Sequence, residues 1–575
     1  MATDSDSYKK WKAVVPLLYD WFANHNLTWP SLTCRWGPKL DESTYKRKYR
    51  IYFSEQTDGT DPQKITVATA EVCKPRVASS ETVTNWNEMN KCPYIKVQKT
   101  INHPGEVNKL RDIPQHPDLI VTHTDAPELF VWNVDKQLGK GATDKKSQAA
   151  APDMILEGHQ ENAEYALGIS TVHPMVASGG RDKKVLLWDL HDAVTGLLAA
   201  GASESRPASS QSSPAKTPKL KERIMLEGHK DIVEDLVFQP GSGDCLASVG
   251  DDYNILLWDT RSGKGPVAKV ERAHGESDLH CVDWSSLDEY LATGCADGSL
   301  KIWDRRKFGA ATDVVKTFPM HRKAVLRVEW SPHKAGVLAS SGEDCVICVM
   351  DLNQKPGRQV ESQEIKRIKR AVPQELLFQH VGHRSMVVDF QWNPLEPWTM
   401  LSVSDDVSPE SGGGTLQMWR INDLIYRPES EVLQELEQHR NWILYGKAGA
   451  PAESVPSTEA TPIATPGTTP ESLKDDHRKP GGESTTFVAE AMETDDVVVA
   501  TSSAAEGGGL VVDAKPDGAT FMTNTQGTVA VTIDAPMQSV QGTLTTPIAT
   551  GTDALSQVVS RNSGGTPSMD GAKSN

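Results

Sequence analysis

Residues 228–259 read GHKDIVEDLVFQPGSGDCLASVGDDYNILLWD, and their pattern returns along much of the 575-residue chain. The stretch begins with Gly-His and ends with Trp-Asp. Between them lie three apolar runs of strand length, DLVF, CLASV and ILLW, which turn residues such as Gly241 and Gly243 separate. One copy of the pattern therefore predicts a small antiparallel sheet.

Three further residues keep a fixed spacing from the histidine in each copy. A Ser or Thr lies 19 residues after it, an Asp 23 and a Trp 29. The three most regular copies contain His159, Ser178, Asp182 and Trp188; His229, Ser248, Asp252 and Trp258; and His274, Thr293, Asp297 and Trp303. Less regular copies begin at His103, His321 and His383. A chain with 16 His and 15 Trp does not produce these offsets through its composition alone.

Buried polar groups at these positions need hydrogen-bond partners, because an unpaired one costs about 1–3 kcal/mol. The spacing lets the four side chains bond to one another and clamp the strands together. The pattern resembles the WD40 repeat, which implies an all-β propeller whose sheets bury one another's faces. Six copies, with strand-like alternation before the first of them, predict seven blades and an N-terminal strand that closes the ring.

Three regions follow from the residue pattern along the chain. Residues 8–26 carry apolar side chains at helical spacing, so we expect an N-terminal α-helix within residues 1–27. The propeller should span residues 28–445, with repeats at about 98–135, 154–190, 224–260, 270–305, 317–352 and 379–421. Residues 446–575 are acidic, rich in Thr, Ser, Ala, Gly and Pro, and without apolar periodicity, which predicts a disordered tail.

The composition narrows the class of partner. The net charge of −17 favours basic partners over nucleic acid or its sequence-specific recognition. No apolar run reaches 18 residues and the first 30 residues lack a signal-peptide core, so we expect an intracellular protein without a membrane span. Eight scattered Cys fit reduced thiols better than disulfides.

Longer strings resemble one family within the WD40 class. They include YKKWK at 8–12, LTWPSLTCRW at 27–36, VPQELLFQHVGH at 372–383 and NPLEPWTMLSVSDD at 393–406. Together with related strings they cover about residues 8–440 and resemble the retinoblastoma-binding histone chaperones, whose plant members are the multicopy-suppressor-of-ira proteins. The string at 412–437 resembles the plant flowering-time branch.

This resemblance implies a nuclear, non-catalytic scaffold subunit that binds histones H3 and H4 and needs no cofactor. It would serve histone deacetylase, chromatin-assembly or Polycomb-type complexes and repress target genes such as flowering-time regulators. The basic residues Lys366, Arg367, Lys369 and Arg370 fit a nuclear-import signal or a solvated loop equally well.

Acidic residues predict a binding rim on one face of the ring. Each repeat should begin near the central channel, so residues just after its histidine line the channel mouth. These rim residues are Glu106, Glu164, Glu234 and Asp278, with Asp251 at a neighbouring turn. Several acids around one mouth attract Lys and Arg. The family resemblance implies that this rim binds the N-terminal tail of histone H3.

A second site follows from the resemblance alone. Relatives hold the first helix of histone H4 between the N-terminal helix and an acidic loop before VPQELLF. The matching residues here are Trp11, Leu18, Phe22, Leu376, Leu377 and Phe378 as apolar walls, with Glu375 and Asp20 as partners for histone cations. The loop itself departs from the pattern, because residues 366–370 are basic and repel a basic helix.

A third motif suggests another class of function. Trp-Asp-x-Arg ends two repeats, with Arg261 and Arg306 at the last position. It resembles the box by which some WD40 proteins dock on the adaptor of cullin ubiquitin ligases, so a substrate receptor is the alternative function. An ordinary surface arginine after a strand is the simpler interpretation of four residues.

Other patterns in the sequence do not support chemistry. Cys345 and Cys348 have metal-like spacing, but residues three apart on a strand point to opposite faces. Gly412–Gly414 lack the strand and helix of a phosphate loop. The repeat accounts for the histidines, so we predict no enzyme and no metal site.

Overall fold

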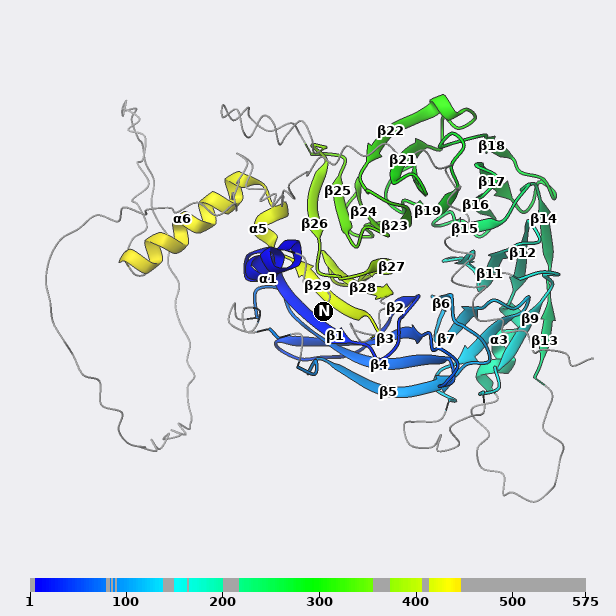
Figure 1. The fold of residues 1–575 in the computed structure, drawn as a ribbon, viewed down its shortest axis with the longest axis horizontal. Coiled ribbons are helices and arrows are strands. Elements are labelled where there is room, and N and C mark those ends of the chain that lie inside the picture. The colour runs from blue at the N-terminus through cyan, green and yellow to red at the C-terminus, as the bar shows by residue number, and fades with distance from the viewer. Residues whose placement is uncertain are drawn as a thin grey trace, which may run out of the picture.

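The computed structural model of the protein describes residues 6–78, 83, 86–87, 90–137, 149–162, 165–199, 217–354, 373–405 and 413–445. Within these ranges seven antiparallel sheets stand around a common axis, which confirms the seven-bladed propeller (Figure 1). The predicted tail at 446–575 and the basic loop at 366–370 lie outside the described residues. No helix in the described part is both long and apolar enough to cross a membrane.

Each blade is one sheet whose first strand lies nearest the axis. The blades are β2 (Cys34–Glu42), β3 (Lys46–Glu55), β4 (Lys64–Cys73) and β5 (Ile95–Asn102); β6 (Lys109–Ile113), β7 (His116–His123), β8 (Leu129–Asn133) and β9 (Met154–Glu157), with β13 (Lys219–Lys221) parallel to β9; β10 (Leu167–Ile169), β11 (Met175–Gly179), β12 (Lys184–Asp189) and β14 (Ile224–Glu227); β15 (Val233–Phe238), β16 (Cys245–Gly250), β17 (Ile255–Asp259) and β18 (Ala268–Val270); β19 (Leu279–Trp284), β20 (Tyr290–Cys295), β21 (Ser299–Asp304) and β22 (Val314–Pro319); β23 (Val325–Trp330), β24 (Val337–Gly342), β25 (Ile347–Asp351) and β26 (Leu376–His380); and β27 (Met386–Trp392), β28 (Thr399–Asp405), β29 (Thr415–Ile421) and β1 (Tyr19–Asn26).

A sequence repeat does not coincide with a blade. In the 224–260 repeat, β14 is the outermost strand of the third blade, whereas β15, β16 and β17 are the first three strands of the fourth. The prediction that one copy forms one sheet is wrong in this respect. Because each repeat crosses from one blade to the next, the loop that holds its histidine ties neighbouring blades together.

The ring closes through β1, which pairs antiparallel with β29 from Asn26 opposite Thr415 to Tyr19 opposite Ile421. The predicted helix over residues 8–26 is therefore too long, because α1 ends at Leu18. The apolar spacing misled the prediction, since a strand buried on both faces also shows a dense apolar run. Trp21 packs in the core between the seventh and first blades and Phe22 in the core under α1.

The clamp of the 224–260 repeat joins three segments through one buried hydroxyl. Asp252 accepts a hydrogen bond from Nδ1 of His229 (3.1 Å), which leaves Nε2 to accept from Ser248 Oγ (2.7 Å). The same hydroxyl accepts from Nε1 of Trp258 at 2.8 Å. Although burial raises the pKa of Asp252, the bonds from His229 and from backbone N–H groups hold it at about 2. Every polar group of the clamp is thus satisfied by another.

The other described copies keep the bond from histidine to hydroxyl and vary the rest. His103, His159, His274, His321 and His383 lie 2.8–3.0 Å from Thr122, Ser178, Thr293, Ser340 and Ser402, respectively. The Asp partner is kept at His159 and His321, whose Nδ1 atoms lie 2.9 Å from Asp182 and Asp344.

Two predicted clamp contacts are wrong. Nδ1 of His274 bonds to Ser299 Oγ (2.8 Å) instead of Asp297, because this copy alone carries a hydroxyl that reaches between them; Asp297 accepts from the Ser299 backbone N–H. Trp188 donates to the Glu157 carbonyl (3.0 Å), because His123 of the preceding blade takes the free side of Ser178 at 2.7 Å.

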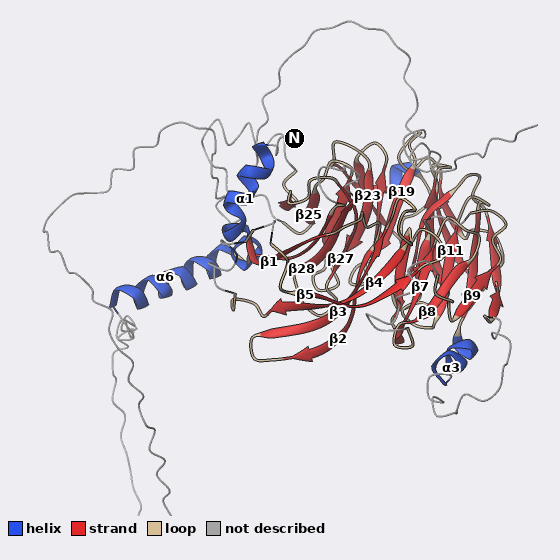
Figure 2. Ribbon diagram, turned by 60° about the horizontal axis from the view of Figure 1, so that its bottom comes forward, coloured by secondary structure: helices blue, strands red, loops and turns tan. Residues whose placement is uncertain are grey.

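Four helices complete the described chain: α1 (Asp6–Leu18), α3 (His191–Ala199), α5 (Asp423–Tyr426) and α6 (Glu429–Tyr445). Figure 2 shows α1 against the side of the ring near the chain start, and α6 projecting away from it. Trp11, Val15 and Leu18 of α1 are buried in the core between the sixth and seventh blades. The N-terminal helix therefore covers the side of the propeller where the ring closes.

Ser248→Ala should destabilise the propeller by about 2–4 kcal/mol, because it leaves two buried groups, on His229 and Trp258, without a partner. Urea unfolding of the whole chain measures the loss. Ser248→Thr is the matched control, since Thr122 and Thr293 hold this place in other clamps. Equal stability of the Ala and Thr variants would contradict the role given to the hydroxyl.

Candidate functional site

The clamps arrange Ser, His and Asp in the order of a hydrolase triad. His159, His229 and His321 each lie within hydrogen-bond distance of a Ser and an Asp. However, the three serines, Ser178, Ser248 and Ser340, are all 0% exposed. A nucleophile must reach its substrate, and these hydroxyls are enclosed by the indoles and histidines that they bond. The arrays stabilise the fold and offer no catalytic group to solvent.

The channel mouth beside these clamps is built from a repeated turn. The backbone N–H groups of Arg181, Asp251, Ala296 and Glu343 donate to carbonyls of the histidine loops, at 2.9–3.0 Å. Each of these residues lies three positions after the Ser or Thr of its clamp. The same position holds Asp125 in the second blade and Asp405 in the seventh. Four of the six positions are acidic, so this mouth is negative, with a basic break at the third blade.

The strongest concentration of charge lies over the fourth and fifth blades. Burial and the nearby carboxylates of Asp278, Asp231 and Asp252 raise the pKa of Asp251 to about 7, although Arg181 opposes the shift. The pKa of Asp278 is also raised, by burial and by Asp231. Lys183 approaches Asp231 at 3.7 Å without neutralising the group. We call Asp231, Asp251 and Asp278 the acidic sector.

The other predicted rim residues are not all brought together. Glu106 lies apart, near Asp125; burial raises its pKa, and its carboxylate accepts from Gln56 Nε2 (3.1 Å). Glu234 begins its inner strand and is half-buried. Glu164 lies outside the described residues.

Sequence reasoning missed Asp231, Asp125 and Glu343. The signal for the last two was present, because the turn position keeps its distance from the clamp hydroxyl.

Exposed cations limit the sector on one side. Arg322 and Lys323 follow His321 in the loop of the sixth blade, and both are exposed. The neighbouring Ala324 is buried where a carboxylate would extend the sector. A basic ligand is therefore expected over the fourth and fifth blades rather than over the whole mouth.

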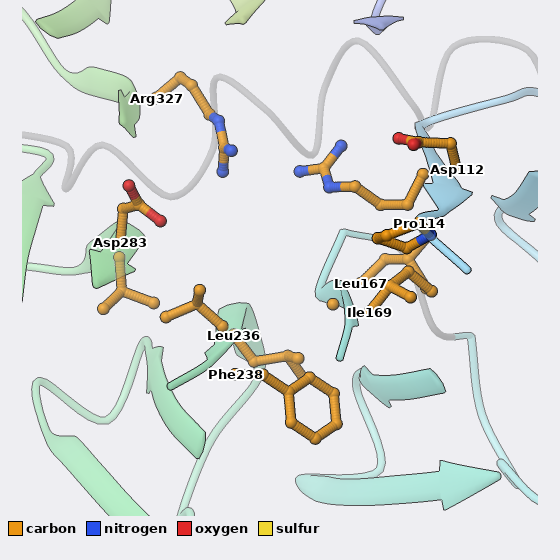
Figure 3. Close-up of a pocket in the computed structure, with 12 residues that line it drawn as sticks. Asp112, Pro114, Leu167, Ile169, Leu236, Phe238, Asp283 and Arg327 are labelled. Atoms are coloured by element: carbon orange, nitrogen blue, oxygen red, sulfur yellow. The ribbon is translucent and has the colours of Figure 1, made fainter. Parts of the chain in front are cut away.

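Below the mouth, the channel wall carries paired charges. Asp235 accepts from Lys109 Nζ (2.8 Å), and Arg35 donates to Asp389 (2.9 Å). A cavity of about 160 Å³ opens among the inner strands; Arg111, Asp112, Asp283 and Arg327 line it on one side and Leu236 and Phe238 on the other (Figure 3). Burial raises the pKa of Asp283 to about 6 and lowers that of Arg111 to about 9. The two acids and two cations balance, so the cavity has no strong preference for either charge.

The predicted side groove is not open. Trp11, Leu18, Phe22, Leu377 and Phe378 are all at most 5% exposed and pack in one core, and only Leu376 is half-buried. The prediction that they contact a partner is wrong, because their apolar surface is already covered by α1 and the sheet edge. They position the helix.

The two acids expected to pair with histone cations are also engaged. Glu375 forms an ion pair with Lys316. Asp20 accepts from Arg420 Nε (2.7 Å) and from the Arg76 backbone N–H (3.1 Å). What α1 presents to solvent instead is Lys9, Lys10, Ala13 and Leu17. This outward surface is basic, and it suits a basic helix poorly.

A buried chain of hydrogen bonds fixes α1 to the ring. Trp11 Nε1 donates to the hydroxyl of Tyr19 (2.9 Å), which lies 2.6 Å from Nδ1 of His380. Nε2 of His380 lies 2.8 Å from Oε1 of Gln417, whose amide N–H₂ donates to Asn24 Oδ1 and the Gly382 carbonyl. Because that amide oxygen must accept, Nε2 of His380 carries the proton and Nδ1 accepts from Tyr19.

The two Trp-Asp-x-Arg arginines lie at equivalent places on adjacent blades. Arg261 follows β17 and Arg306 follows β21, and their side chains are 68% and 66% exposed. Each guanidinium is held by the Asp of its own motif, Asp259 at 2.8 Å and Asp304 at 2.7 Å. The arginines are thus exposed and pre-oriented.

One group of potential metal ligands occurs among the described residues. His274, Cys295 and Asp297 bring their ligand atoms within 4.8 Å of one another. Both nitrogens of His274 are already bonded to hydroxyls, and burial raises the pKa of the Cys295 thiol to about 11. A metal needs the free imidazole nitrogen and the thiolate, so these residues do not fit one. Cys345 and Cys348 are likewise free thiols.

Comparison with known proteins gives two family matches and two close relatives. Residues 6–74 match the family of histone-binding protein RBBP4, which also includes a component of the CAF1 complex. Residues 151–189, 220–259, 265–304 and 312–351 match the WD domain, G-beta repeat. WD-40 repeat-containing protein MSI4 of Arabidopsis thaliana is 45% identical over 449 residues, which cover 76% of this chain and 86% of MSI4. MSI3 of the same plant is 29% identical over 431 residues, covering 74% and 92%.

Tyr19→Phe should loosen α1, because it leaves Nε1 of Trp11 and Nδ1 of His380 buried without a partner. We expect a loss of about 2–4 kcal/mol in unfolding free energy and faster hydrogen exchange at the α1 amides. Tyr45→Phe is the matched control, since that side chain is 63% exposed. If both variants exchange at the wild-type rate, the hydrogen-bond chain does not hold the helix.

Proposed function

Because the chain belongs to the RBBP4/MSI family of histone-binding WD40 proteins, we propose that it binds histones and serves as a scaffold in chromatin complexes. In this proposal the acidic sector receives the basic N-terminal tail of histone H3. The protein acts in the nucleus and contributes binding rather than catalysis. Its client complexes are of the deacetylase, chromatin-assembly or Polycomb type, and their action represses target genes, among them flowering-time regulators.

The raised pKa of Asp251 is the observation that carries the proposal. A carboxyl reaches a pKa of about 7 here because three acids share one site with too little opposing charge. A lysine or arginine that enters the sector relieves this repulsion, so it binds more strongly than at an isolated surface acid. A channel mouth also focuses the field of its charges on an approaching cation. The H3 tail supplies several such cations in an extended segment.

Histone H4 is the weaker of the two proposed histone partners. The side surface offers Lys9, Lys10 and Leu17 of α1 rather than an open apolar groove. We propose that the first H4 helix, if it docks here, uses Leu17 and adjoining surface instead of the buried residues under α1. The top face therefore makes the larger contribution to histone affinity.

Reversal of charge in the sector should abolish most of the tail affinity. We expect Asp251→Lys with Asp278→Lys to weaken binding of an H3 tail peptide by about tenfold or more at low salt, where exposed charges are least screened. Titration calorimetry measures the affinity. The matched control, Asp192→Lys with Glu289→Lys, changes the net charge equally but lies at the opposite ends of the strands, after β12 and before β20.

Equal weakening in both double variants would mean that net charge, and not the acidic sector, attracts the peptide. Unchanged affinity in the sector variant would remove the proposal for this face.

The alternative function is docking on the adaptor of a cullin ubiquitin ligase. It is favoured by the exposed, pre-oriented guanidiniums of Arg261 and Arg306 on adjacent blades, since a held Arg is a good interface anchor. Such docking is compatible with the scaffold role, because these arginines end strands that run away from the acidic sector.

Capture of the purified adaptor should fall at least about tenfold when both arginines are replaced by Ala, since each hot-spot Arg contributes roughly 1–2 kcal/mol or more. Surface plasmon resonance measures the capture. Arg272→Ala, an equally exposed arginine on another loop, is the control. Full capture by the double variant would show that the motif is an ordinary strand ending.

A further inference from the structure

The helix α6 leaves the ring and carries a large apolar surface. It projects away from the propeller in both views (Figures 1 and 2). Five of its apolar residues are exposed: Leu433 by 57%, Leu436 by 49%, Trp442 by 57%, Ile443 by 64% and Leu444 by 60%. Single exposed apolar residues are ordinary on protein surfaces, but five on one helix form a contiguous patch that favours a binding partner.

The start of α6 is fixed to the propeller. Glu435 accepts from Arg76 and from Arg427, both at 2.6 Å, and Asp423 of α5 also pairs with these two arginines. Val432 is buried, and Tyr426 stacks on Trp398 with ring centres 4.2 Å apart. The exposed surface is thus held out in a defined direction.

Four residues of α6 follow the spacing of a two-stranded coiled coil. Leu433, Leu436, Arg440 and Ile443 are separated by three, four and three residues, which are the a and d positions of successive heptads. Leu444 adjoins this stripe, whereas Trp442 lies about 180° around the helix from Leu433 at 100° per residue. One face of α6 is therefore an unpaired helix seam.

We propose that α6 pairs with α6 of a second copy of this chain, antiparallel and about a two-fold axis. A two-fold pair brings the same surface of both copies together, so the surface must complement itself. The α6 seam does so. Its acids Glu431, Glu435 and Glu437 lie in the first half, and its cations His439 and Arg440 lie in the second. Only an antiparallel pair sets the acidic half against the cationic half.

The register follows from the heptad positions. In an antiparallel pair, a positions of one helix lie in the same layers as d positions of the other. A two-fold axis at Gln438 places Leu433 opposite Ile443 of the second copy and Leu436 opposite its Arg440. The stem of that Arg440 then covers Leu436, and its guanidinium reaches Glu437. Within one chain these two charges lie only loosely paired, at 3.9 Å and 67% exposed each.

The size of the seam predicts weak association. A pair of 17-residue helices buries less than the roughly 1,200 Å² of a standard interface, so the dimer should form in the micromolar range or weaker. Such a dimer would place two propellers, each with its own acidic sector, in one particle. The pairing is independent of histone binding, and the acidic sector acts without it.

Sedimentation equilibrium of the full chain tests the pairing. We expect wild type to shift from monomer toward dimer with rising concentration, and Ile443→Glu to weaken association at least tenfold. Trp442→Glu is the matched control, because it adds the same charge on the opposite helix face. Both positions are exposed, so unchanged thermal unfolding should show that each variant folds.

A charge exchange tests the register. Glu437→Arg and Arg440→Glu should each stay monomeric alone, because like charges meet across the axis. A mixture of the two variants should dimerise at least as well as wild type, because every charge then meets its opposite.

A single monomer mass for wild type up to roughly 1 mM, or equal weakening by Trp442→Glu and Ile443→Glu, would overturn the proposal. A monomeric wild type would assign the seam to a helix of another protein.

Discussion

One buried hydroxyl per repeat holds this structure together. In the fourth blade Ser248 receives the indole N–H of one strand and donates to a histidine that follows the outer strand of the preceding blade. The bond crosses from blade to blade, so each clamp is also a link in the ring. Since an unpaired buried polar group costs about 1–3 kcal/mol, removing one partner leaves the others unsatisfied and affects two blades at once.

The acidic sector is a consequence of the same clamps. Asp251 immediately precedes Asp252, which is fixed by His229, and Asp231 lies two residues after that histidine. The clamp therefore positions carboxylates at the channel mouth without any further structure, and raises the density of charge there. A scaffold that recognises basic tails requires little more than variation of the residues next to an invariable support. The arginine at position 181 and the cations at 322–323 show how such variation limits the surface.

Period and spacing predicted most of the fold. The offsets from histidine to hydroxyl identify the blades, because one geometry must recur wherever the same bond is made. They did not predict the ends of α1, since Tyr19–Asn26 has enough apolar residues to suit either a helix or a strand, and only its pairing with β29 decides. The side groove was also wrong: Trp11 and Phe378 are the residue types of a groove wall, and burial depends on what covers them. Asp297 lost its clamp role to Ser299, a hydroxyl whose reach cannot be read from spacing.

The central claim is that under-neutralised carboxylates at the channel mouth receive a basic histone tail, and proton release tests it most directly. A cation beside Asp251 favours its charged form, so binding should lower a pKa of about 7 and expel a proton. Calorimetry of H3 tail binding at about pH 7, in two buffers of different ionisation enthalpy, counts that proton. The account predicts release of roughly half a proton by wild type and almost none by Asp251→Asn. Binding of the peptide without proton release from wild type would contradict it.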